Sequence, residues 1–346
     1  MRQHAIARAG SSTRGHAERA YRVAPRGPLP AFTVVVATKD RPGLLEGCLS
    51  SLAAALARSD EIVVVDSAST PPVPMELCSR YGARLLRCEL PGTSHARNTG
   101  WRAARSSIVA FVDDDVRVDP GWADGVRACF AGLVPGGAGA PAFLTGRLGP
   151  EPGRGPVERP VALMDEPAPG LLHRGMATGF GHGANMAVLR FALDAVGGFD
   201  ERLGPGARWR AAEDLDLLDR LLAAGFTGRY EPAAHAWHVQ WRSQHEILLL
   251  EWSYGVGQGA RVATLRRRDP GRARRVASMA VLDGGIADLA HCIAQRYERG
   301  AARAVLRLTG IAWGAATRTA ALQEWMPAAL RRRRYETARQ PRGSDG

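Results

Sequence analysis

Short, continuous apolar runs alternate with amphipathic segments through the first third of the chain. The runs at 32–37 (FTVVVA), 61–66 (EIVVVD), 84–88 and 108–112 are rich in β-branched or aromatic residues and predict buried strands. Between them, apolar residues at helical spacing predict helices near 44–56, 75–81 and 94–105. Strands that alternate with helices in this way are typical of an α/β fold with a mostly parallel sheet and right-handed crossovers.

The pattern is weaker after the helix predicted at 120–131. Residues 135–175 are rich in glycine and proline and predict a long loop of the kind that covers a substrate. The elements expected around and beyond this loop are a strand at 140–145, helices at 189–196 and 214–225, and strands at 227–231 and 234–237. Residues 246–330 interleave alanine, leucine and arginine and predict three further helices.

Composition and charge narrow the class of protein. The chain has 346 residues, of which 45% are hydrophobic, and its formal net charge of +12 rests almost wholly on arginine because Lys39 is the only lysine. Five scattered cysteines without a CxxC pair argue against a disulfide framework or a zinc site. Residues 1–30 lack the apolar core of a secretory signal, and no uninterrupted apolar run reaches the ~18 residues of a membrane span. We therefore expect a cytoplasmic protein, soluble or peripheral at the inner face of the membrane, with no nucleic-acid partner.

Polar side chains follow three of the predicted strands at the points where the strands end. They are Thr38 and Asp40, then Asp66, then the three consecutive acids Asp113, Asp114 and Asp115. Because ligands of open α/β sheets bind beyond the carboxyl ends of the strands, we expect these groups to converge on one edge. Crowded carboxylates repel one another unless a cation neutralises them, so the acids favour a Mg²⁺ or Mn²⁺ site, with Asp113 and Asp115 as the best pair. The alternative is a solvated acidic turn that leads into a helix capped by Asp119.

Eight motifs occur in order between residues 31 and 240. They are VVVATKDRP (34–42), VVVDSAS (63–69), SHARNTGW (94–101), FVDDDVRVDPGW (111–122), GANMAV (183–188), GGFDERLG (197–204), AEDLDLLDRLLAAGF (212–226) and YEPAAHAWH (230–238). Together they resemble an inverting family-2 glycosyltransferase of the GT-A fold. The resemblance implies a Rossmann-like, mostly parallel mixed sheet flanked by helices, with a C-terminal helical region beyond it.

The resemblance also implies a division of the chain. Residues 31–240 would form the glycosyltransferase domain, with a nucleotide-sugar half at 31–120 and an acceptor half at 180–240. Residues 1–30 would be a disordered basic leader, 241–330 a helical appendage and 331–346 a basic disordered tail.

Several residue roles follow from the same resemblance. Thr38 and Asp40 would line the nucleotide cleft, Asp66 would accept a hydrogen bond from the base, and Arg97 would approach the base or the phosphates. Asp113 and Asp115 match the DxD motif, which faces ribose and metal, and Asp114 is ambiguous between those roles. His238 could reach the metal, and Gly183, Asn185 and Glu213 would contact the acceptor. Lys39 stands where the family often has a tyrosine against the base, which leaves base recognition open.

Asp214 is the expected catalytic base. Transfer of a sugar with inversion needs a carboxylate that removes the proton from the attacking acceptor hydroxyl. A helix N-cap is the alternative role for Asp214, and the two roles are compatible.

We expect metal-dependent transfer of a sugar from a nucleotide-diphosphate-sugar to a hydroxyl acceptor, such as a cell-envelope glycan, a lipid-linked glycan or a secondary metabolite. The rival functions are nucleotidyl transfer and non-catalytic binding of a nucleotide-sugar. The C-terminal helices could contact an anionic membrane surface or form a cap on the domain, and the cap is slightly favoured. The donor base, the sugar, the acceptor and the oligomeric state stay open.

Overall fold

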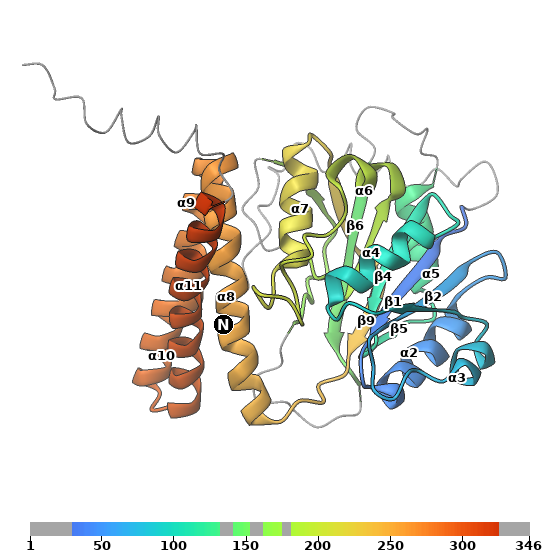
Figure 1. Cartoon of the computed structure of the whole chain (residues 1–346), viewed down its shortest axis with the longest axis horizontal. Helices are drawn as coiled ribbons and strands as arrows, with labels where there is room; N and C mark the ends of the chain where they lie inside the picture. Colours follow the sequence, from blue (N-terminus) through green and yellow to red (C-terminus); the bar gives the residue numbers. More distant parts are fainter. Residues whose placement is uncertain (1–29, 132–140, 153–161, 175–180, 325–346) are drawn as a thin grey trace, which may run out of the picture. The chain divides into compact units, whose positions relative to one another are not determined.

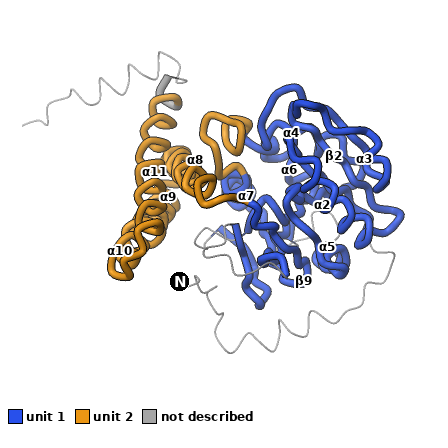
Figure 2. The backbone as a smooth tube through the Cα atoms, turned by 90° about the horizontal axis from the view of Figure 1, so that it is seen from below, with its two compact units in different colours: residues 1–200, 214–241 blue, residues 201–213, 242–346 orange. Residues whose placement is uncertain are grey.

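The protein is described here by a computed structural model that covers residues 30–131, 141–152, 162–174 and 181–324. The chain forms two compact units, residues 1–200 with 214–241 and residues 201–213 with 242–346 (Figure 2). The predicted leader, apart from Pro30, and the basic tail at 331–346 lie outside the described residues. So do the parts of the predicted 135–175 loop at 135–140, 153–161 and 175.

The first unit is built on a mixed sheet of nine strands (Figure 1). Its strands are β1 (Thr33–Thr38), β2 (Glu61–Ser67), β3 (Arg84–Cys88), β4 (Ile108–Asp113), β5 (Val116–Val118), β6 (Phe143–Pro150), β7 (Gly170–Leu172), β8 (Asn185–Leu189) and β9 (Gly228–His238). They lie in the order β3-β2-β1-β4-β8-β6-β9-β5, and β7 also pairs with β9. The four strands β3, β2, β1 and β4 are parallel to one another, as the alternating pattern predicted. Strand β8, on the other side of β4, runs antiparallel to it.

Helices cover both faces of this sheet because the central strands are apolar on both sides (Figure 1). Val34 and Val36 of β1 belong to a core shared with α2 (Pro42–Ala55), α3 (Met75–Arg80) and α5 (Trp122–Phe130). Val35, which points to the other face, packs in a second core with α4 (Thr93–Ala103), α6 (Arg190–Val196) and α7 (Glu213–Ala223). The result is a three-layer α/β/α arrangement, in agreement with the predicted fold class.

Several predicted elements differ from the observed ones. The motif at 183–188 overlaps strand β8, which was not predicted and whose short apolar run is interrupted by no polar residue that could mark a face. The two strands predicted at 227–231 and 234–237 are one strand, β9, which continues through Pro232 to His238. Helix α5 begins at Trp122 rather than at Pro120, with Asp119 accepting a hydrogen bond from the Gly121 amide at 2.9 Å.

The second unit is helical. It contains α8 (Gln244–Arg268), α9 (Pro270–Ser278), the π-helical segment η1 (Met279–Ala287), α10 (Asp288–Ala294) and α11 (Glu298–Glu324). Ser243 and Glu246 form a capping box that satisfies the first turn of α8. Because α9, η1 and α10 follow one another without a break, the unit consists of three rods, in agreement with the three helices predicted for 246–330.

Helices α8 and α11 approach each other at glycines. A methyl group at Gly255 or Gly259 would meet the backbone of α11, and one at Gly310 or Gly314 would meet the backbone of α8. The pair is also joined by Glu251, which is buried and receives hydrogen bonds from the guanidinium groups of Arg303 and Arg307. Small residues and a paired buried charge therefore fix the register of these two helices.

The rod from Pro270 to Ala294 is long and apolar enough to cross a membrane. It has 25 residues and contains an 18-residue window of mean hydropathy 1.4. Only 17% of that window is buried. Asp283 and Asp288 interrupt the segment, so it is not an uninterrupted apolar run, but its mean hydropathy lies in the range of membrane spans.

Candidate active site

The polar ends of β1, β2 and β4 lie side by side. The strand register pairs Thr38 of β1 with Asp66 of β2, and Ala37 of β1 with Asp113 of β4. The convergence predicted from the sequence is thus observed, and it arises because three parallel strands end at the same level of the sheet.

Asp114 is the buried centre of this edge. Its carboxylate accepts a hydrogen bond from the Thr38 hydroxyl at 2.7 Å and forms an ion pair with Arg41 at 2.9 Å. The side chain is fully buried, and burial raises the pKa of Asp114 to about 7 even though Arg41 acts in the opposite direction. Asp114 and the Thr38 hydroxyl therefore satisfy each other inside the protein rather than facing a ligand.

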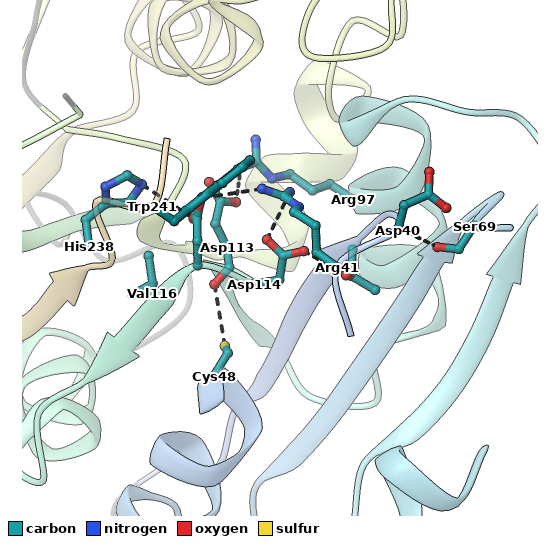
Figure 3. Close-up of polar contacts among 12 residues, drawn as sticks. Asp40, Arg41, Cys48, Ser69, Arg97, Asp113, Asp114, Val116, His238 and Trp241 are labelled. Atoms are coloured by element: carbon teal, nitrogen blue, oxygen red, sulfur yellow. Dashed lines mark hydrogen bonds and ion pairs between the residues drawn. The ribbon is translucent and has the colours of Figure 1, made fainter. Parts of the chain in front are cut away.

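Asp115 is held by residues from the far end of the first unit. Its Oδ2 accepts a hydrogen bond from the Trp241 indole at 2.8 Å and lies 3.4 Å from Arg41, while its Oδ1 lies 3.4 Å from His238 Nε2 (Figure 3). Burial alone would raise the pKa of Asp115, but its hydrogen bond to His238 and the charges of His238 and Arg41 outweigh burial, so its pKa lies below the usual range. Asp115 is consequently ionised throughout the neutral range.

Arg41 and Trp241 are site residues that the sequence did not reveal. The Arg41 guanidinium lies 5.5 Å from the centre of the Trp241 ring, and both side chains contact Asp115. Arg41 belongs to the quoted motif VVVATKDRP, but its charge was not assigned a role, and Trp241 lies just beyond the last quoted motif. The contact between Trp241 and Asp115 depends on the tertiary fold, since 126 residues separate them in the sequence.

Asp113 faces a different partner. Its Oδ1 accepts a hydrogen bond from Arg97 Nη2 at 2.6 Å, and a third of the Asp113 side chain is exposed, whereas Arg97 is almost fully buried. Arg97 also lies over the Phe199 ring, 5.4 Å from its centre. A buried guanidinium that extends from α4 to an exposed carboxylate presents a positive charge at the strand-end edge.

Asp66 and Asp40 form a second group at the end of β2. Asp66 accepts hydrogen bonds from the amides of Ser69 and Val73 and from Arg87 at 2.7 Å. Burial alone would raise the pKa of Asp66, but these hydrogen bonds lower it. Asp40 has a left-handed backbone with φ of 55°, donates its amide to the Ser69 hydroxyl and accepts from the Thr70 amide, so it fixes the same loop. Arg87, a further residue that the sequence did not reveal, thus shares the position at which the resemblance places the base.

Gly183 lies between Asp214 and Arg97. The Gly183 amide donates to Asp214 Oδ2 at 2.8 Å, and the Leu215 amide donates to Oδ1 at 2.7 Å. A methyl group built on Gly183 would lie 2.8 Å from Arg97 Nη1 and 3.0 Å from Asp214 Cβ. Three residues predicted for the site, namely Arg97, Gly183 and Asp214, are therefore brought together, and only a residue without a side chain fits between the other two.

The remaining predicted acceptor residues have other neighbours. Asn185 is buried, accepts a hydrogen bond from the Trp122 indole and donates to the carbonyls of Arg147 and Ala234. These bonds engage its amide inside the protein and favour a role in holding the strands. Glu213 belongs to the segment 201–213 of the second unit, where its carboxyl group lies beside Gly204.

A divalent cation fits part of the predicted ligand set. Among the residues that the structure describes, no three His, Cys, Asp or Glu side chains are grouped as a metal site. Asp115 and His238 are adjacent, whereas the Asp113 carboxylate faces Arg97. One carboxylate and one imidazole suit Mn²⁺ or Mg²⁺, which commonly take further oxygens from a substrate diphosphate. The predicted three-residue set is thus not preformed, and its members Asp115 and His238 contact each other directly, with 3.4 Å between Oδ1 and Nε2.

Comparisons with known proteins show what this chain is similar to. Residues 33–126 match the family model described as Glycosyl transferase family 2. Two curated relatives from strains of Mycobacterium tuberculosis, both named pre-mycofactocin glycosyltransferase, are 31% identical over 235 residues, which cover 64% of this chain and 44% of theirs. The chain therefore spans less than half the length of the curated relatives it matches.

The fold is also found in a solved structure. The mannosyltransferase PcManGT from Pyrobaculum calidifontis, determined in complex with GDP-Man and Mn²⁺, aligns with a TM-score of 0.55 and 21% identity. The alignment covers 88% of this chain and 92% of that one. This likeness confirms the predicted α/β fold of the GT-A type with a C-terminal helical region.

Proposed function

Because this chain carries a family-2 glycosyltransferase domain, we propose that it transfers a sugar from a nucleotide-diphosphate-sugar to a hydroxyl group of an acceptor. The observation that carries the proposal is the position of Gly183 between Arg97 and Asp214. Gly183 lies beside both the Arg97 guanidinium, a cation suited to a leaving diphosphate, and Asp214, a carboxylate suited to a proton. These are the two charges that sugar transfer needs on either side of the anomeric carbon.

We assign the donor to the edge formed by β1, β2 and β4. The loop fixed by Asp66 and Asp40 would receive the nucleoside, with Arg87 as an additional hydrogen-bond donor beside Asp66. Asp115 and His238 would hold a Mn²⁺ or Mg²⁺ ion, which supplies positive charge to the diphosphate when it is bound. Arg97 adds a second positive charge on the side of Asp113.

We assign proton removal to Asp214. Its two oxygens already accept hydrogen bonds from the Gly183 and Leu215 amides, which orient the carboxylate. In the proposed reaction the acceptor oxygen attacks the anomeric carbon, the bond to the diphosphate breaks, and Asp214 takes the hydroxyl proton. Direct attack of this kind inverts the anomeric configuration, which NMR of the product would reveal.

The experiment that tests this function is product analysis with a panel of nucleotide-sugars in the presence of Mn²⁺. Sugar transfer predicts release of a nucleoside diphosphate that increases when a hydroxyl acceptor is supplied. Release of pyrophosphate would instead indicate nucleotidyl transfer. Tight donor binding without either product would indicate a binding protein, and both results would contradict the proposal.

A further inference from the structure

A row of large apolar side chains is exposed along the rod formed by α9, η1 and α10. Leu282, Ile286 and Ile293, here called the apolar ridge, are 52%, 51% and 64% exposed. Their spacing of four and seven residues places them on one face of the helical rod. Such a row on a helix normally covers a core or meets a partner.

The opposite face of the same rod is already packed within the second unit. Cys292 is fully buried, a methyl group on Gly285 would overlap Leu308 of α11, and Arg307 of α11 donates to the Gly284 carbonyl at 3.0 Å. The rod is therefore held by α11 on one side and leaves the apolar ridge on the other.

Arginines are exposed at both ends of the ridge. Arg274 and Arg275 precede it, and Arg296 and Arg299 follow it. Arg274 and Arg275 belong to α9, whereas Arg296 lies in the turn after α10 and Arg299 in the first turn of α11, so the two pairs lie near opposite ends of the rod. Between residues 266 and 299 the chain has eight arginines and four acidic residues, so this segment is basic. An apolar row with positive charge at each end matches the boundary between acyl chains and anionic headgroups.

We propose that this face docks on an anionic lipid bilayer, with the rod lying in the plane of the interface. The apolar ridge enters the acyl boundary, and the four arginines contact lipid phosphates. A second copy of the chain is a poorer occupant, because antiparallel or parallel pairing of two such rods places arginines against arginines.

The in-plane orientation follows from the charges on the rod and its neighbours. Asp283 is exposed beside the ridge, next to Leu282, and α11 carries Arg303 and Arg307 paired with the buried Glu251 of α8. If the rod crossed the bilayer, these groups would lie at the depth of the hydrocarbon, where ionised side chains are costly. Lying flat, the rod keeps Asp283 at headgroup level although its length and hydropathy would permit a span.

The test is flotation of the full-length protein with vesicles of phosphatidylcholine alone or mixed with phosphatidylglycerol. We expect binding to the anionic vesicles and at least tenfold weaker binding to the neutral ones. The double variant Leu282→Ser/Ile286→Ser should weaken anionic binding by about tenfold or more, since half-exposed side chains tolerate the change without unfolding. Met75→Ser, which alters a 70% exposed residue of the first unit, serves as its control and should bind like the wild type.

The arginines are tested separately. Arg274→Ala and Arg275→Ala should each lower affinity for the anionic vesicles about fivefold, whereas the exposed Arg58→Ala should not. Equal binding by the ridge variant and the wild type, or no binding to anionic vesicles, would overturn the proposal. A dimer that light scattering detects in the wild type but not in the ridge variant would also overturn the proposal. Protein that detergent releases from membranes, but alkaline carbonate does not, would overturn it as well.

Discussion

Replacement of Asp214 by asparagine separates the proposed proton acceptor from the backbone hydrogen bonds that the same residue accepts. Both carboxylate oxygens accept backbone amides, from Gly183 at 2.8 Å and from Leu215 at 2.7 Å. Asparagine keeps one accepting oxygen but turns an NH₂ group toward one of these amides. The substitution therefore removes one charge-assisted hydrogen bond and the negative charge, and leaves the volume of the side chain unchanged.

The two consequences differ in size. Loss of one hydrogen bond to a charged group costs about 1.5–3 kcal/mol of folding free energy. A domain with a typical stability of about 5–15 kcal/mol stays folded after such a loss. Loss of a general base lowers the rate by about 100- to 10,000-fold, or roughly 3–5 kcal/mol of transition-state free energy. A large fall in transfer rate would thus exceed anything that the folding cost can explain.

The assay measures donor binding by calorimetry and transfer by product formation on the same preparations. We expect Asp214→Asn to bind the donor within about threefold of the wild type and to transfer at least about 100-fold more slowly. Asp119→Asn makes the same change at the start of α5, where Asp119 accepts the Gly121 amide, and should retain transfer. Transfer by Asp214→Asn at half the wild-type rate or more would refute the assignment of Asp214 as the base.

Three further outcomes follow from the structure. Burial raises the pKa of Asp114 from 3.8 to about 7, so its contribution to stability is complete at low pH and is lost as the pH rises through 7. The unfolding free energy of Asp114→Asn, measured in denaturant melts, should therefore rise relative to that of the wild type by at most about 4 kcal/mol between about pH 4 and pH 8. A difference that does not change with pH would contradict the raised pKa of Asp114. Gly314→Ala would place a methyl group on the Val256 carbonyl and should destabilise the second unit by about 1–3 kcal/mol in thermal melts, whereas Gly43→Ala, with open space around it, should not. If Gly183 keeps Arg97 and Asp214 at the distance that transfer needs, Gly183→Ala should slow transfer more than tenfold and leave donor affinity nearly unchanged. Normal turnover by this variant would argue against that role of the glycine.

The strand-end acids show how much of the site could be predicted from the sequence. A run such as 108–112 predicts a buried strand, and parallel strands necessarily end together, so the convergence of Thr38, Asp66 and Asp113 followed from pattern and topology. Residues 33–126 match the model described as Glycosyl transferase family 2, in agreement with the resemblance drawn from the motif order. The individual roles of the site residues stay predictions.

What the sequence left out was set by contacts between distant segments. Nothing near Trp241 indicates that its indole binds Asp115, and nothing in the motif around Arg41 indicates that its guanidinium lies between two acids. Asn185 illustrates the opposite case, since a polar residue in a glycine-rich motif attracted a functional interpretation while its hydrogen bonds join neighbouring strands. Strand β8 was missed because its short apolar run, placed next to glycines, has no period that separates a strand from a helix.

The pairing of Asp115 with His238 is the feature on which the donor site depends, and calorimetry with and without Mn²⁺ tests it most directly. For the wild type, we expect Mn²⁺ to strengthen uptake of the nucleotide-sugar at least tenfold. Asp115→Asn should lose that gain, whereas Asp119→Asn should keep it. Equal donor affinity with and without Mn²⁺, together with full turnover by Asp115→Asn, would contradict a cation-assisted sugar transfer at this edge of the sheet.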